Sequence, residues 1–265
     1  MKYIWLFLGL FLVQGCSISI EQAKNEQPAN EGTYGVATTP ESSTANDLEV
    51  KPAFETKTGK VRTLPRFHSL LHNVAGNVVW KQGDEQRVEI QALPEVIEQV
   101  VTEVKEGGLL YVGFRDSNYQ LNDNKLYIFI TTPDIKAIRL SGSGNLQSKN
   151  RWEVDKVSLA ISGSGNMDIR LKANKVTADL LGSGNINLKG KADKYVLDMS
   201  GAGNIAGHQM KVDQCKVLMS GSGSCVLTVK EALDVYIKGS GFVTYKGNPV
   251  LTKKVDGSGN VVKAK

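Results

Sequence analysis

Two aspartates are the best-placed residues for chemistry in this chain of 265 residues. Asp179 and Asp198 each precede a glycine-rich turn by three residues, and such turns recur along the chain at nearly the same interval. Stacked copies of one unit would place the two carboxylates about 5 Å apart, close enough for acid–base catalysis or for holding a cation. No long insertion interrupts the repeats here to form the walls of a cleft. We therefore interpret both aspartates as charged side chains on a solvent-exposed face and predict no catalytic residue.

Histidine supplies little further chemistry, because the chain has only 3 histidines. His68 and His72 have the four-residue spacing that chelates a metal ion on a helix. The residues around them alternate as in a strand, where this spacing separates side chains by about 13 Å. We therefore predict no metal site and no cofactor.

Asparagine recurs three residues after the first glycine of most turns, at Asn145, Asn166, Asn185, Asn204 and Asn260. Stacked amides of this kind can form a structural ladder, bonded along the axis of the stack. They can equally present a row of amides to a ligand. Ser224 and Phe242 interrupt the column, which favours the structural interpretation, and we keep Asn145, Asn166, Asn185 and Asn204 as candidate ligand-binding residues.

Aromatic side chains near the end of the chain form a second candidate binding surface. Tyr236, Phe242 and Tyr245 lie within ten residues of one another. If they are exposed together, they would form a patch for a glycan or a partner protein. A uniformly polar surface would instead favour a purely structural role.

A repeated glycine turn must position all of these residues. Its first glycines are Gly142, Gly163, Gly182, Gly201, Gly221, Gly239 and Gly257. The residues two before and four after each of these glycines are apolar in every copy, and the residues between them alternate with the period of a strand. An aspartate, asparagine or glutamate stands eight residues before each turn up to Gly239, which indicates a second corner. The pattern predicts an all-β parallel β-helix with coils of about 20 residues.

The remaining segments are less regular. Residues 61–265 are predicted to form the head domain, with regular repeats from about residue 136 and irregular β coils before them. Gly107-Gly108 indicates a hairpin, and Ala75-Gly76-Asn77 resembles a decayed copy of the turn. The segment 94–104 fits either a strand or one face of a short helix.

The N-terminal residues indicate export and lipid attachment. Residues 1–16 combine Lys2, an apolar run too short to span a bilayer, and Val13-Gln14-Gly15-Cys16, which resembles a lipobox. We predict that Cys16 is lipidated, with palmitate among the attached chains, and that residues 17–60 are a disordered tether. Ser17 after the cysteine favours the outer membrane by resemblance to lipoprotein sorting signals.

The distribution of charge indicates which classes of partner the head could bind, and the positions of the cysteines indicate whether they are buried. The chain has a net charge of +5, and the basic excess lies in residues 61–265, which could favour anionic glycans or lipid headgroups. It lacks the polybasic cluster and stacking platform of nucleic-acid binders, so we predict no nucleic-acid partner. Cys215 and Cys225 both fall in inward columns, which fits two buried thiols and leaves a disulfide open.

The turns Ser141-Gly-Ser-Gly-Asn145 and Ser162-Gly-Ser-Gly-Asn166 resemble those of the auto-transporter adhesin head domain family, also called the GIN domain. The run Gly108-Leu109-Leu110 and the step Thr132-Pro133-Asp134-Ile135 agree with this family as well. The resemblance covers roughly residues 65–265. It implies a single-stranded, right-handed β-helical head on an exported, often lipid-anchored protein, and it carries no catalytic residues.

We therefore expect a non-enzymatic, lipid-anchored envelope protein whose head binds a surface glycan or protein. Two alternatives remain open: a polysaccharide-degrading β-helix enzyme and a purely structural envelope component. The enzyme would need a walled groove around acids and bases such as Asp179 and Asp198.

Overall fold

The computed structural model describes residues 58–121 and 125–265. These residues belong to one unit, Lys51–Lys265. The predicted signal, Cys16 and nearly all of the predicted tether lie outside the described residues. The first strand, β1 (Thr58–Arg62), includes residues 58–60, which their composition had assigned to the tether.

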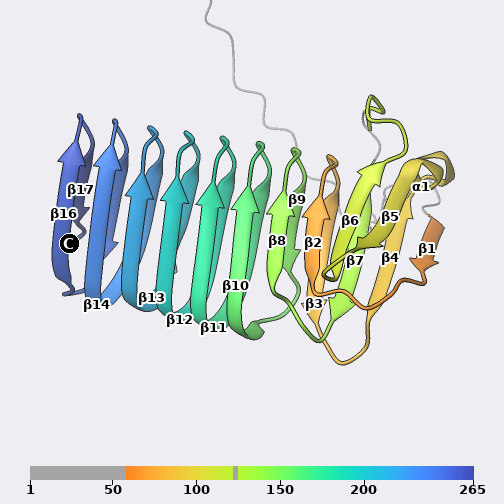
Figure 1. The fold of residues 1–265 in the computed structure, drawn as a ribbon, viewed down its shortest axis with the longest axis horizontal. Helices are drawn as coiled ribbons and strands as arrows, with labels where there is room; N and C mark the ends of the chain where they lie inside the picture. Colours follow the sequence, from red (N-terminus) through yellow and green to blue (C-terminus); the bar gives the residue numbers. More distant parts are fainter. Residues whose placement is uncertain (1–57, 122–124) are drawn as a thin grey trace, which may run out of the picture. The chain divides into compact units, whose positions relative to one another are not determined.

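The second half of the chain is a stack of parallel coils, as the repeat predicts (Figure 1). Its strands are β8 (Ala137–Leu140), β9 (Asn145–Ser148), β10 (Trp152–Ile161), β11 (Asn166–Leu180), β12 (Asn185–Met199), β13 (Asn204–Met219), β14 (Ser224–Lys238), β15 (Phe242–Lys246), β16 (Val250–Asp256) and β17 (Asn260–Lys263). Each pairs in parallel with the equivalent strand of the next coil, so that Asn166 lies beside Asn185 and Leu180 beside Met199. The inward columns are buried, except that Val255 in the last coil is half-buried. The predicted β-solenoid is thus confirmed.

The first coils of the domain do not stack in chain order. They consist of β2 (Ser69–His72), β3 (Asn77–Gln82), β6 (Leu109–Phe114) and β7 (Tyr127–Thr132). β2 and β3 pair on one side with β8 and β9 and on the other side with β6 and β7. The coil that comes first in the chain therefore lies between two later coils. Asn77, in the predicted decayed turn, becomes the direct neighbour of Asn145.

Antiparallel strands close this end of the stack. They are β4 (Arg87–Ala92), which pairs with β1 and β7, and β5 (Val100–Lys105), which pairs with β6. Between them lies the short helix α1 (Pro94–Gln99), so the segment 94–104 is a helix followed by a strand. Gly107 and Gly108 turn the β5–β6 hairpin with φ values of 73° and 68°, a region that favours glycine.

The glycine turns are required by close stacking of backbones. At Gly201, an added Cβ would overlap the carbonyl oxygen of Gly182 in the preceding coil, and at Gly203 it would overlap the Gly184 carbonyl. The same relation repeats along the regular coils. Two glycines per turn therefore let successive turns approach to the spacing set by the strands on either side.

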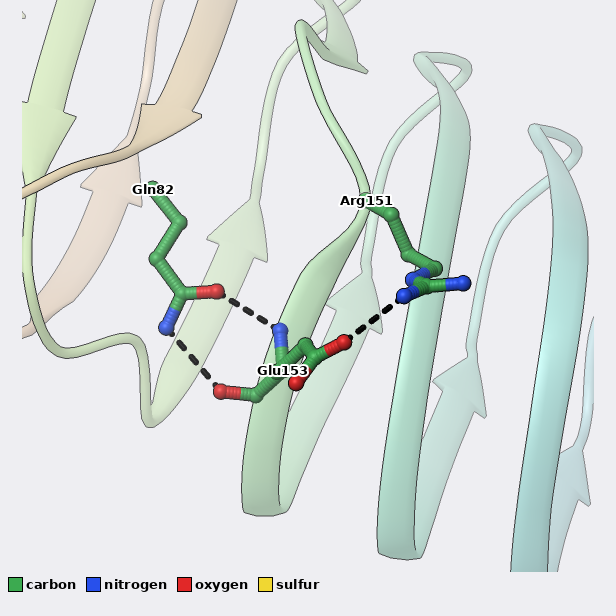
Figure 2. A network of polar contacts seen from close by, with 3 residues as sticks. All are labelled: Gln82, Arg151 and Glu153. Carbon is green, nitrogen blue, oxygen red and sulfur yellow. Dashed lines mark hydrogen bonds and ion pairs between the residues drawn. The ribbon is translucent and has the colours of Figure 1, made fainter.

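A side-chain clamp joins the irregular coils to the first regular ones (Figure 2). Gln82 donates its amide to the carbonyl oxygens of Pro133 and Glu153, both at 3.0 Å, and accepts the Glu153 N–H at 2.6 Å. Asn150 adds two bonds to the Gln82 backbone. Next to this clamp, the rings of Trp80 and Trp152 meet edge-on in the core. These contacts hold together segments about 70 residues apart in the sequence.

The core of the regular coils contains two thiols. Cys215 and Cys225 are buried and are not joined by a disulfide in this structure. Burial raises the pKa of Cys215 to about 12 and raises that of Cys225 well above its ordinary value. Both thiols are therefore protonated at neutral pH and pack as small apolar side chains.

Candidate functional site

The recurring asparagines form a continuous amide ladder that is longer than the sequence repeat indicates. Each Nδ2 donates to the Oδ1 of the preceding coil, from Asn145 to Asn77 at 3.0 Å and onward at 2.7–3.0 Å. Ser224 ends the run by donating its hydroxyl to Asn204 at 2.7 Å. The ladder consists of Asn77, Asn145, Asn166, Asn185, Asn204 and Ser224.

The ladder has a structural role and also leaves some amide donors and acceptors unused at the surface. An amide has two donor hydrogens and an acceptor oxygen with two lone pairs, and each inner asparagine uses one of each along the axis. One N–H and one lone pair per side chain remain for solvent or a ligand. All four candidate asparagines are exposed. The structural and ligand-binding interpretations of this column are therefore compatible.

A groove of about 380 Å³ runs beside the ladder across five adjacent strands, β7, β3, β9, β11 and β12. Its polar lining comes from two neighbouring outward columns: the ladder itself and the column of Gln147, Asp168 and Asn187. Val79 and Tyr127 line it from the irregular coils. We call this surface the amide groove, with the lining residues Asn77, Val78, Val79, Tyr127, Asn145, Leu146, Gln147, Asn166, Met167, Asp168, Asn185 and Asn187.

Electrostatics in the amide groove are close to neutral. Its one acid, Asp168, forms an ion pair at 3.1 Å with Lys189 of the next coil. At one end Tyr127 stacks on Phe129 with ring centroids 6.4 Å apart and an angle of 19° between the rings. The groove thus offers amides along its length and the ring of Tyr127 at one end, which suits an uncharged ligand rich in hydroxyl groups.

The three candidate aromatic residues do not form one patch. Tyr236 and Phe242 are 43% and 52% exposed, but they lie on strands that precede and follow the turn at Gly239. Tyr245 is only 9% exposed, which corrects the expectation that it contributes to a surface patch. It lies two residues after the inward Val243, and the alternation of the strand directs it into the core beside Leu227.

The two aspartates are neighbours in register, as predicted, because Asp179 pairs with Asp198 across β11 and β12. Partial burial raises the pKa of Asp179, repulsion from Asp198 raises it further, and Arg139 opposes both effects. The pair lies on strand segments that precede the turns, whereas the amide groove lies on segments that follow them. Neither aspartate lines the groove.

His68 and His72 lie in different environments. His72 is fully buried in β2, and its Nε2 lies 3.1 Å from the Gly76 carbonyl oxygen. His68 precedes the strand, and its Nδ1 lies 3.0 Å from the Ser69 hydroxyl. Across residues 58–121 and 125–265, no group of three potential metal ligands gathers.

In the same ranges, no helix is long and apolar enough to cross a bilayer.

Sequence reasoning missed the second wall of the groove. Gln147, Asp168 and Asn187 follow the ladder residues by two positions in successive coils, so the same alignment on the turns could have found them. Nothing in the repeat could locate Tyr127. It reaches the site because β7 pairs with β3, outside chain order.

Comparison with known proteins agrees with this architecture. A crystal structure of a "putative adhesin" from Bacteroides fragilis NCTC 9343 superposes with a TM-score of 0.75 and 23% identity, covering 79% of this chain and 98% of that chain. A "putative lipid binding protein" from Parabacteroides distasonis ATCC 8503 gives a TM-score of 0.64 and 20% identity, covering 80% and 98%. At these identities the likeness shows a shared fold. No curated protein is significantly similar to the chain.

The family model described as "Putative auto-transporter adhesin, head GIN domain" matches residues 66–249. This range includes the amide groove, the irregular first coils and most of the regular ones. The match confirms the resemblance noted in the turn sequences, and the chain belongs to this adhesin head GIN-domain family.

Proposed function

We propose that the protein is a lipid-anchored cell-envelope protein whose solenoid head binds a surface glycan in the amide groove. The observation that carries the proposal is the groove itself. It combines two columns of hydrogen-bonding side chains, most of them amides, with the ring of Tyr127, which stacks on Phe129. Amides can bond sugar hydroxyl groups in either direction, and aromatic rings pack against the apolar faces of sugars.

The dimensions of the groove favour a glycan over other ligands. Small-molecule sites have volumes of roughly 300–1,000 Å³, and about 380 Å³ fits a few sugar rings. A stable protein partner would need a much larger contact, on the order of 1,000 Å² or more. A lipid, the ligand class in the name of one structural relative, would leave the second N–H and the second lone pair of each ladder amide without a hydrogen-bond partner where its apolar chains lie.

The head acts by binding rather than by catalysis in this proposal. Family membership in an adhesin group supports it, as does the position of Asp179 and Asp198 outside the groove. The alternative of a polysaccharide-degrading enzyme is tested in the same experiment as binding. The alternative of a purely structural component predicts no glycan retention at all.

The binding test uses the full chain and a panel of neutral polysaccharides (dextran, mannan and laminarin), with retention and reducing-end release measured together. We expect retention without release, and roughly thirtyfold weaker retention when Gln147 and Asn187 are both changed to alanine, because two polar contacts of about 1 kcal/mol each are lost. Gln209→Ala with Gln214→Ala is the matched control, since both are exposed amides outside the groove.

Equal loss of retention in the groove variant and the control would reject the groove as the binding site. If the wild type releases reducing ends and the double variant Asp179→Asn, Asp198→Asn does not, the protein is a polysaccharide-degrading enzyme and the binding proposal is rejected. If the panel is not retained at all, the structural alternative gains support.

Lipid attachment is tested separately, at Cys16. Changing Cys16 to serine is expected to abolish incorporation of an azide-tagged palmitate and to release the protein from the membrane fraction, because serine lacks the thiol that is acylated. Ser17→Ala is the control and should label as the wild type does. Labelling that persists in Cys16→Ser would contradict the proposed anchor.

A further inference from the structure

Opposite the glycine turns, the long strands bend at a second corner of the stack (Figure 1). Six lysines form two columns beside this bend. One column lies just before the bend of the long strands and contains Lys172, Lys191 and Lys211. The other lies just after the bend and contains Lys156, Lys175 and Lys194. We call these the lysine columns.

The fold holds these side chains outward. Ala173, Ala192 and Val212 follow the first column directly in the sequence and are buried, so alternation directs the lysines to the surface. All six lysines are exposed. Within each column, neighbouring lysines are direct register partners on adjacent strands, roughly 4.8 Å apart.

Like charges directly opposite one another in a sheet are unfavourable, yet here they are repeated in two columns. Within the described part of the chain, Lys156 forms one long ion pair with Asp155 at 3.8 Å, and the other five lysines form none. The corner column between them contains Asp155, Asn174, Asp193 and Asp213. Asp213 is engaged by Lys230, outside the two columns. Glu153, which forms an ion pair with Arg151 at 2.8 Å, is the register partner of Lys172 on the other side of that column. The six lysines outnumber the acids beside them, Glu153, Asp155, Asp193 and Asp213, so the corner has an excess of positive charge.

We propose that the lysine columns bind a linear anionic polysaccharide, which lies along the axis of the stack. Its carboxylates, carried on successive sugars, would meet lysines that repeat at nearly the same interval. The columns extend over four coils, or roughly 15 Å, along a narrow corner. A polymer chain can follow such a strip, whereas a flat anionic membrane would touch a convex corner along a single line. This site is separate from the amide groove and does not depend on it.

The test measures binding of the full chain to polygalacturonate, with dextran as the uncharged comparison. We expect the wild type to bind polygalacturonate and to lose affinity steeply as salt rises, since binding releases counterions from the polymer. Lys172→Gln, Lys191→Gln and Lys211→Gln together should weaken binding roughly tenfold or more and flatten the salt dependence. Their melting temperature should equal or exceed that of the wild type, because repulsion is removed.

The matched control changes Lys216, Lys238 and Lys253 to glutamine. These lysines are exposed and lie outside both columns, and the control alters the net charge by the same amount. Full binding by the control together with loss in the column variant supports the proposal. Equal weakening of both would show that only net charge matters and would overturn it. Wild-type binding to vesicles with 30% anionic lipid but not to polygalacturonate would also overturn it, in favour of a membrane contact.

Discussion

Replacing Gly201 by alanine is expected to destabilise the solenoid by about 3 kcal/mol or more. The added methyl group would overlap the Gly182 carbonyl oxygen and lie 2.8 Å from its carbon. Both atoms belong to the backbone, which adjacent strands hold in register on each side of the turn. The turn can accept a Cβ only by separating two coils, and that would weaken their hydrogen bonds.

Urea unfolding of the full chain, followed by circular dichroism, measures this loss. The control is Gly142→Ala, where the nearest atoms to the new Cβ belong to Val74 and lie at 3.3–3.4 Å. A shift of a few tenths of an ångström accommodates that methyl group, so the control should cost less than about 1 kcal/mol. Equal effects at the two positions would contradict close stacking as the reason for the glycine repeat.

Acid is expected to destabilise the domain by about 3 kcal/mol between pH 6.5 and pH 4, through His72 alone. Burial lowers the pKa of His72 from 6.5 to about 4, and the bond to the Gly76 carbonyl opposes this only in part. The unfolded chain takes up a proton near pH 6.5, while the folded chain resists it until about pH 4. The contribution is therefore fully present above pH 6.5 and is lost as the pH falls through this window.

Unfolding free energies measured at intervals from pH 7 to pH 4 give the size of this effect. His72→Leu should flatten the dependence by about 3 kcal/mol, because leucine fits this inward column, where Leu140 lies beside His72. The Gly76 carbonyl keeps its bond from the Asn145 N–H, so the variant should still fold. His208→Gln, at an exposed histidine, is the matched control. A curve for His72→Leu as steep as that of the wild type would show that other groups cause the acid sensitivity.

The amide groove and the lysine columns are two surfaces that differ in charge. The groove has one acid, Asp168, which Lys189 neutralises, so the groove suits an uncharged sugar. The columns carry an excess of positive charge and suit a polyanion. A head that holds both neutral and acidic segments of an envelope polysaccharide would need both surfaces, and the two binding tests separate them.

Periodicity in the sequence determined the regular half of the molecule. Each coil is local in sequence and is paired with its immediate successor, so aligning the glycine turns placed the inward residues correctly, with Val255 in the last coil only half-buried. The same alternation could have shown that Tyr245 is buried, since it follows the inward Val243 by two residues. It also predicted that Asp179 and Asp198 would be neighbours.

Only the tertiary structure decided the irregular half and the position of the groove. The coil of β2 and β3 is inserted between two later coils, which brings Asn77 to Asn145 and Tyr127 to the end of the ladder. No repeat encodes that order, because it depends on which exposed strand edges are completed by segments about 70 residues away. Side-chain contacts such as the Gln82 clamp and the Trp80–Trp152 packing stabilise the arrangement, and such long-range pairings leave no periodic signal in the sequence.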